Sequence, residues 1–162
     1  MEGSNKKFWR VIQKIQTDNW GFRLSFIDNN LIAFQPIQIY QGNWTGSRNL
    51  VIYSINHEYG LYTKQREISV QGFGQICSFF CPQSYIASKG ILLTKNGCTI
   101  NLVKFTFDST NSNYDCTLEC AINFGDLEQG ELFASMSDDG EYLITWDPQS
   151  REIQIRRFND RN

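Results

Sequence analysis

The chain has 162 residues, of which 41% are hydrophobic and 20% charged, and its formal net charge at pH 7 is −2. This length and balance are typical of one globular domain with a buried core, and they exclude a disordered or membrane-spanning chain. A weakly acidic protein lacks the basic face that binds nucleic acid or anionic membranes, so we expect neither partner. The first residues do not form a secretory signal, and we expect an intracellular, soluble, cytoplasmic protein.

Short stretches of alternating apolar and polar residues predict strands throughout the chain. Aromatic residues make up 14% of the sequence and proline occurs three times, a composition that favours strands over helices. The first candidate strand is residues 8–15, FWRVIQKI, and residues 21–26, 31–35 and 50–56 form the next group. Residues 36–49 are predicted to be a long loop between the last two of these strands.

The clearest hairpin signal lies in the middle of the chain. Residues 91–95, ILLTK, and residues 98–105, CTINLVKF, flank Asn96-Gly97. This dipeptide is preferred in the two-residue type I′ turn, because both central positions need a positive φ. Further strands are predicted at residues 62–70, 76–80 and 116–122.

The last part of the chain, residues 131–158, predicts three short strands joined by two tight turns. Earlier groups of strands repeat this organisation with a period of about 50 residues, which is typical of β-propeller blades. We therefore expect an all-β, β-propeller-like domain over residues 1–162, formed as a partial or open propeller of about three four-stranded blades. The predicted blades cover residues 16–70, 71–122 and 123–158, with the N-terminal strand 8–15 in addition.

The last predicted blade lacks a fourth strand after Phe158. In closed propellers a terminal strand from one end completes the blade at the other end and removes an exposed edge. Because three blades are fewer than the four to eight of closed rings, we expect a fragment of a larger propeller, a self-associating half-ring or an open array. Arginines near the C-terminus are interpreted as the charged surface of an edge strand: Arg151, Arg156, Arg157 and Arg161.

The string SDDGEYLITWD, residues 137–147, resembles the WD-repeat family of propellers. Residues 137–140 match the family's turn between its first two strands, and residues 142–145 and 152–158 match its second and third strands. The sequence lacks the Gly-His pair that opens a typical repeat, and Arg157-Phe158 stands in place of the Trp-Asp pair that ends one. The resemblance implies a rigid platform for protein–protein contacts that has no intrinsic catalysis.

Two aromatic residues of the predicted loop, Tyr40 and Trp44, are candidates for binding a partner. An aromatic side chain on a loop either packs back on the domain or anchors an interface, and the sequence leaves both alternatives open for Trp44. Trp9 and Trp20 neighbour apolar strands, so they are predicted to be core or blade-edge residues.

The five cysteines are interpreted as free, buried thiols rather than as metal ligands. Cys77 and Cys81, like Cys116 and Cys120, are four positions apart within predicted strands, which separates their side chains by about 13 Å, too far to ligate one metal ion. We therefore predict no metal, no cofactor and no catalytic residue, and expect that the protein is not an enzyme.

The leading prediction is a non-catalytic protein-interaction or scaffold module of WD-repeat type within a larger assembly, with a protein partner that the sequence does not specify. One alternative is a small ligand-carrying β-barrel, because Gly42-Asn43-Trp44 resembles the Gly-x-Trp signature of such carriers. That signature normally lies on the first strand, whereas here it falls in a predicted loop. A truncated paralogue without retained function is the other alternative.

Overall fold

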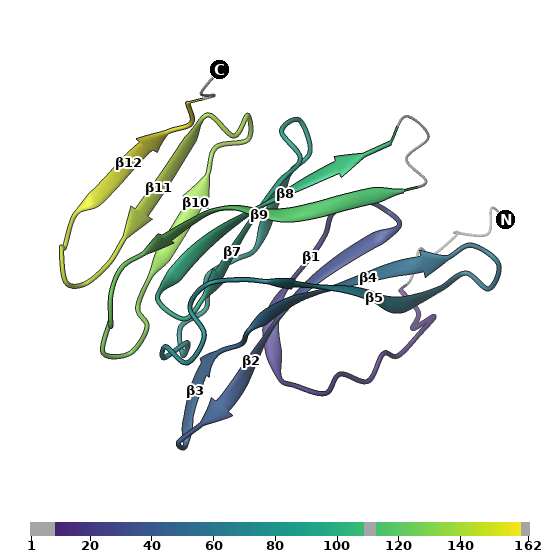
Figure 1. Cartoon of the computed structure of the whole chain (residues 1–162), viewed down its shortest axis with the longest axis horizontal. Helices are drawn as coiled ribbons and strands as arrows, with labels where there is room; N and C mark the ends of the chain where they lie inside the picture. Colours follow the sequence, from purple (N-terminus) through teal and green to yellow (C-terminus); the bar gives the residue numbers. More distant parts are fainter. Residues whose placement is uncertain (1–8, 109–112, 160–162) are drawn as a thin grey trace, which may run out of the picture.

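The computed structural model describes residues 9–108 and 113–159, which contain twelve strands and no helix. The strands form three antiparallel sheets, so the prediction of an all-β protein is confirmed, and none of the described sheets closes on itself. Figure 1 shows the three sheets following one another in sequence order across the molecule. Within the described ranges, no helix is long and apolar enough to cross a membrane.

The first sheet has the strand order β1-β2-β4-β5, and β3 pairs with the second half of β2. Its strands are β1 (Gly21–Phe26), β2 (Leu31–Tyr40), β3 (Asn43–Gly46), β4 (Asn49–Asn56) and β5 (Leu61–Ser69). The prediction of a loop over residues 36–49 is therefore wrong, because β2 continues to Tyr40 and β3 runs back antiparallel to it. Pro36, which cannot donate a ladder hydrogen bond, stands where β2 changes partner from β4 to β3.

The other two sheets are simple meanders of four and three strands. The second sheet contains β6 (Ser84–Ile86), β7 (Ile91–Asn96), β8 (Thr99–Phe107) and β9 (Tyr114–Asn123). The third contains β10 (Phe133–Met136), β11 (Tyr142–Trp146) and β12 (Ile153–Arg157). β12 lies at the edge of the third sheet, as its arginines predicted, whereas Arg161 lies outside the described residues.

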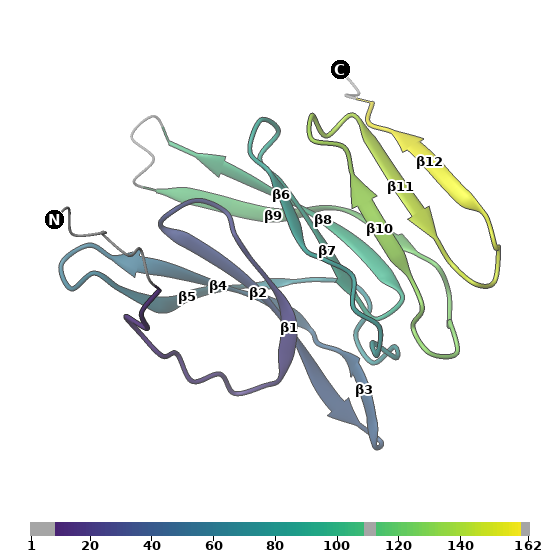
Figure 2. The same ribbon diagram turned by 180° about the vertical axis from the view of Figure 1, so that it is seen from behind.

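The predicted strand at residues 8–15 is not formed: residues 9–16 follow an irregular path, and residue 8 lies outside the described part of the chain. The Gln13 side-chain amide binds the edge of β5 instead. Its Oε1 accepts from the Tyr62 N–H at 2.8 Å, and its Nε2 donates to the Tyr62 carbonyl at 2.7 Å. Figures 1 and 2 place the N-terminal segment beside the first sheet, at the opposite end of the molecule from β12.

The predicted strand at residues 76–80 is also wrong, because residues 76–80 belong to an irregular connection that leads to β6. Its backbone hydrogen bonds go to the β2–β3 hairpin rather than to a new strand. The Cys77 N–H donates to the Trp44 carbonyl at 2.8 Å, and the Gln75 carbonyl accepts from the Gly46 N–H at 2.8 Å.

The predicted hairpin of β7 and β8 is confirmed, but its turn is shifted by one residue. Asn96 pairs with Thr99, so Gly97 and Cys98 are the two central residues of the turn. Only Gly97 of this pair has a positive φ, of 57°, which is the pattern of a type II′ turn with glycine in its first position. Asn96 remains in the strand, where its side chain takes part in a buried hydrogen-bond network.

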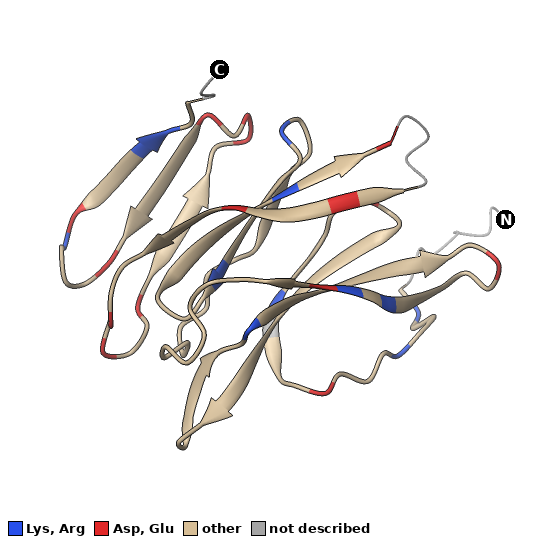
Figure 3. Ribbon diagram, viewed as in Figure 1, with Lys and Arg blue, Asp and Glu red and all other residues tan. Residues whose placement is uncertain are grey.

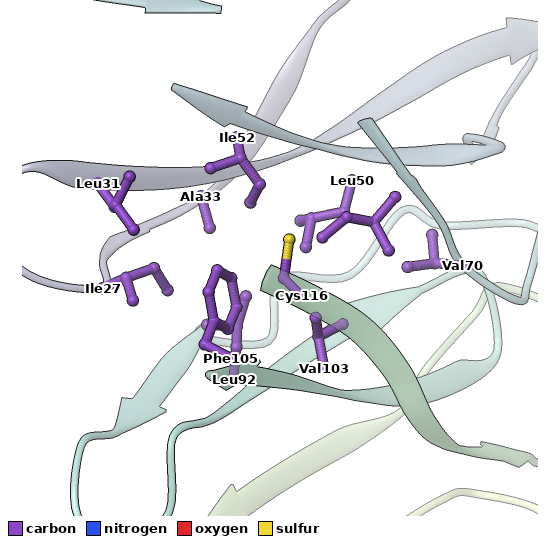
Figure 4. Close-up of a cluster of buried hydrophobic side chains, with 11 residues drawn as sticks. Ile27, Leu31, Ala33, Leu50, Ile52, Val70, Leu92, Val103, Phe105 and Cys116 are labelled. Carbon is purple, nitrogen blue, oxygen red and sulfur yellow. The ribbon is translucent and has the colours of Figure 1, made fainter. Parts of the chain in front are cut away.

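Two clusters of buried apolar side chains lie between successive sheets, and β7 contributes to both. Leu92 belongs to the cluster shared with the first sheet, whereas the adjacent Leu93 belongs to the cluster shared with the third. Adjacent strand residues point to opposite faces, so the second sheet packs on both sides and every residue of β7 is buried. Figure 4 shows the first cluster, in which Phe105 and Leu92 face Ala33 and Ile52.

Truncation of Leu93 tests whether the second core holds the third sheet. Leu93→Ala removes a side chain with no exposed surface and should lower the free energy of unfolding by about 2–5 kcal/mol, measured by urea denaturation. Ile153→Ala, at a side chain that is 72% exposed, is the matched control and should change it by no more than about 0.5 kcal/mol. Equal losses in the two variants would contradict this packing.

Candidate interaction site

The β2–β3 hairpin is built around a tight turn at Gln41 and Gly42. Both residues have a positive φ, of 50° and 78°, as a type I′ hairpin turn requires. The turn brings Ile39 opposite Trp44 and Tyr40 opposite Asn43. In Figure 1 the hairpin extends away from the rest of the first sheet, so its side chains are presented at one end of the molecule.

Trp44 forms one wall of a groove, and Trp20 contributes the neighbouring aromatic ring. The two ring centroids are 6.3 Å apart, and the hydrogen bond from the Ile37 N–H to the Trp20 carbonyl, at 2.7 Å, fixes Trp20 beside β2. Trp44 is 43% exposed and Trp20 is 69% exposed. The groove has a volume of about 370 Å³ and is lined by Asp18, Asn19, Trp20, Ile37, Gln38, Ile39 and Trp44.

The structure separates the two residues that the sequence singled out. Tyr40 is one position along from Ile39, and strand residues alternate between faces, so Tyr40 and Trp44 lie on opposite faces of the hairpin. Tyr40 is 53% exposed and does not line the groove. Trp20, for which a core or blade-edge position was predicted, does not belong to the core: it is exposed beside Trp44, just before the edge strand β1. Trp9 does not belong to the core either.

A buried amide network fixes the base of the hairpin to the second sheet. Asn96 Nδ2 donates to the carbonyls of Ser47 and Gln71, at 2.8 and 2.9 Å. Asn96 Oδ1 accepts from the Ser47 N–H at 3.0 Å and from Gln35 Nε2 at 3.2 Å. Gly46 is packed against the same region so closely that a Cβ there would lie 2.2 Å from the Gly72 carbonyl oxygen. The groove is therefore carried on a rigid support.

A second polar cluster below the hairpin joins β1, β7 and the irregular connection that leads to β6. The sulfur of Cys77 accepts from Arg23 Nη1 and from the Gly97 N–H, each at 3.2 Å. The Phe79 carbonyl accepts from Lys95 Nζ at 3.2 Å and from Arg23 Nη2 at 2.5 Å. Arg23 and Lys95 have no exposed surface, and burial lowers the pKa of the Lys95 ammonium group.

The cysteines are free thiols, four of them buried: Cys77, Cys81, Cys98 and Cys116. Cys120 is exposed, contrary to the prediction that all five are buried. Burial raises the pKa of Cys81. Within the described part of the chain, no group of three or more His, Cys, Asp and Glu side chains is placed to hold a metal ion.

The turn that carries the WD-repeat resemblance is held by its own side chains. Asp139 Oδ1 accepts from Ser137 Oγ at 2.6 Å and from the Glu141 N–H at 2.9 Å, and Gly140 has a φ of 69°. The hydrogen bond from Ser137 holds the pKa of the Asp139 carboxyl below its usual range. These contacts give Asp139 a structural role within the turn.

Comparison with known proteins gives this geometry no assignment. No protein-family model matches the chain, and no curated protein matches its sequence.

The buried Lys95 predicts a pH dependence of stability. Because burial lowers the pKa of Lys95 in the folded protein, the unfolded chain binds more protons between the folded and unfolded pKa values. Lys95 should therefore add a pH-dependent contribution to the free energy of unfolding. This contribution should rise with pH up to the ordinary lysine pKa of about 10.4 and fall as the pH is lowered. Lys95→Met should remove this contribution.

The measurement is urea denaturation of the wild type and of Lys95→Met between about pH 7 and 10.5. The free energy of unfolding of the wild type, relative to that of the variant, should increase as the pH rises. A difference between the two proteins that stays constant over this range would contradict the assignment.

Proposed function

We propose that this protein is a non-catalytic protein-interaction module of WD-repeat type that works within a larger assembly. The three sheets would be successive blades of a propeller-like array. This arrangement is supported by the two apolar clusters, each of which joins one sheet to the next in sequence order. It is also supported by the similar meander order of the strands in each sheet.

The observation that carries the proposal is the exposed Trp20–Trp44 groove on its rigid base. Tryptophan is enriched among residues that dominate binding energy, because it offers a large apolar area at low cost in conformational entropy. The amide network of Asn96 fixes the hairpin before a partner arrives, which reduces the ordering cost of association. A protein partner would pack an apolar side chain against the indoles in the groove and meet Asp18 and Asn19 with polar groups.

The alternative of a ligand-carrying barrel gains no support from the arrangement of strands. A carrier barrel encloses its ligand within a sheet that closes on itself, whereas the described sheets remain open. Gly42 lies in the turn of the β2–β3 hairpin, and Asn43 and Trp44 begin β3. In such carriers the signature lies on the first strand instead.

Replacement of Trp44 tests the proposed function. Immobilised wild type and Trp44→Ala would be exposed to extract of the source cells, and the bound proteins quantified by mass spectrometry. Proteins that depend on the groove should be reduced about tenfold or more with Trp44→Ala, as for loss of a dominant interface aromatic.

Tyr59→Ala is the matched control, because Tyr59 is an aromatic residue that is 68% exposed and lies outside the groove. It should leave recovery unchanged. If the Trp44 and Tyr59 variants recover the same proteins in the same amounts as wild type, the groove is not the binding site.

A further inference from the structure

The third sheet is one strand shorter than the second, on which it packs. The first two sheets reach a fourth strand in their main order, β5 and β9 respectively, whereas the third ends at β12. No strand among residues 9–108 and 113–159 pairs with the outer edge of β12. Figure 1 shows β12, in yellow, as the outermost strand on its side of the molecule.

A cleft of about 710 Å³ lies between the second and third sheets next to β12. Leu102 of β8 and Ile122 of β9 contribute apolar side chains from the second sheet. Met136 and Leu143 contribute them from the third. The other lining residues are Ile91, Glu119, Cys120, Gly140, Arg156, Arg157, Phe158 and Asn159.

The outer edge of β12 adds backbone donors and acceptors to this apolar cleft. A strand at the edge of a sheet directs half of its N–H and C=O groups away from its neighbour, which makes it a template for another extended chain. The outward face of β12 is apolar, with Ile153 and Ile155 exposed at 72% and 68%. An added strand would contact the cleft with one set of alternate side chains and lie beside these isoleucines with the other.

Charge indicates the kind of strand that fits. The segment from residue 151 to 157 carries Arg151, Arg156 and Arg157 against the single acid Glu152. Figure 3 shows the end of β12 in blue. Arg156 is held in place at the cleft by donating to Thr145 Oγ1 at 2.6 Å and to Gln154 Oε1 at 2.5 Å. Arg157, the next residue, lies on the opposite face of β12 together with Ile153 and Ile155, and its exposed guanidinium favours a carboxylate on the incoming chain.

We infer that β12 and the adjoining cleft bind an extended acidic segment of a partner protein, which adds to the third sheet as its fourth strand. Apolar residues at alternate positions of this segment pack on Leu102 and Ile122 in the cleft, and a carboxylate at one of the other positions pairs with Arg157 on the outward face of β12. The site is separate from the Trp20–Trp44 groove. The inference rests on the proposed function only in taking the protein to bind other proteins.

A synthetic peptide provides the probe. The peptide has seven residues and blocked ends, and it alternates valine with glutamate and threonine. Titration into isotopically labelled protein, followed by NMR, should give saturable binding with amide shifts concentrated in β12, β8 and β9. A peptide with lysine in place of glutamate should bind about tenfold or more weakly, and a peptide with proline at its centre should not bind.

Arg157→Glu provides the matched change in the protein, at an exposed position where a substitution should leave the fold intact. It should weaken binding of the glutamate peptide about tenfold and strengthen binding of the lysine peptide. Trp44→Ala should leave binding of both peptides unchanged, so a failure of the groove proposal is distinguished from a failure of this one.

Three results would overturn the inference. The first is no saturable binding of the glutamate peptide at millimolar concentration, and the second is equal binding of the glutamate and lysine peptides. The third is a doubled molar mass of the free protein that is lost when residues 1–15 are removed. That result would assign the edge of β12 to the N-terminal segment of a second copy, whose Arg10 and Lys14 are basic.

Discussion

The burial of β7 on both of its faces is the constraint on which the rest of the structure depends. Leu92 and Leu93, adjacent in the strand, belong to two different cores, so a single strand joins three sheets. A shift of β7 by one residue would exchange its two faces and disrupt both cores together. The stacking of the sheets therefore fixes the register of the second sheet more strongly than the hairpin turn alone.

This constraint carries polar groups into the interior as well. The second half of β7 consists of Thr94, Lys95 and Asn96, which are fully buried. Buried polar groups are costly without hydrogen-bond partners, and here the partners come from the base of the β2–β3 hairpin and from the connection that leads to β6. The same contacts that satisfy the interior of the second sheet thus hold the aromatic groove in place.

Alternating patterns were sufficient to predict the all-β class and most central strands, because burial of a strand requires apolar residues on the buried face. They failed where the availability of a partner decides the outcome. Residues 8–15 have a mixed pattern of apolar and polar residues and form no strand over the described positions, where Gln13 binds the edge of β5. Pro36 suggested a loop although it stands at a change of strand partner. At the candidate site, Trp44 was identified and Trp20 was missed. The signal for Trp20 was its position just before β1, opposite the Ile37 whose N–H it binds.

The contact between the N-terminal segment and Tyr62 depends on the amide group of the Gln13 side chain. An amide side chain offers one donor and one acceptor, which is what the two backbone groups of Tyr62 require. Deamidation would convert Gln13 to glutamate, whose ionised carboxylate accepts but does not donate, so a carboxylate oxygen would face the Tyr62 carbonyl oxygen, which is also an acceptor. Deamidation of this one side chain would therefore weaken the attachment of the segment to the first sheet and leave the two cores unchanged.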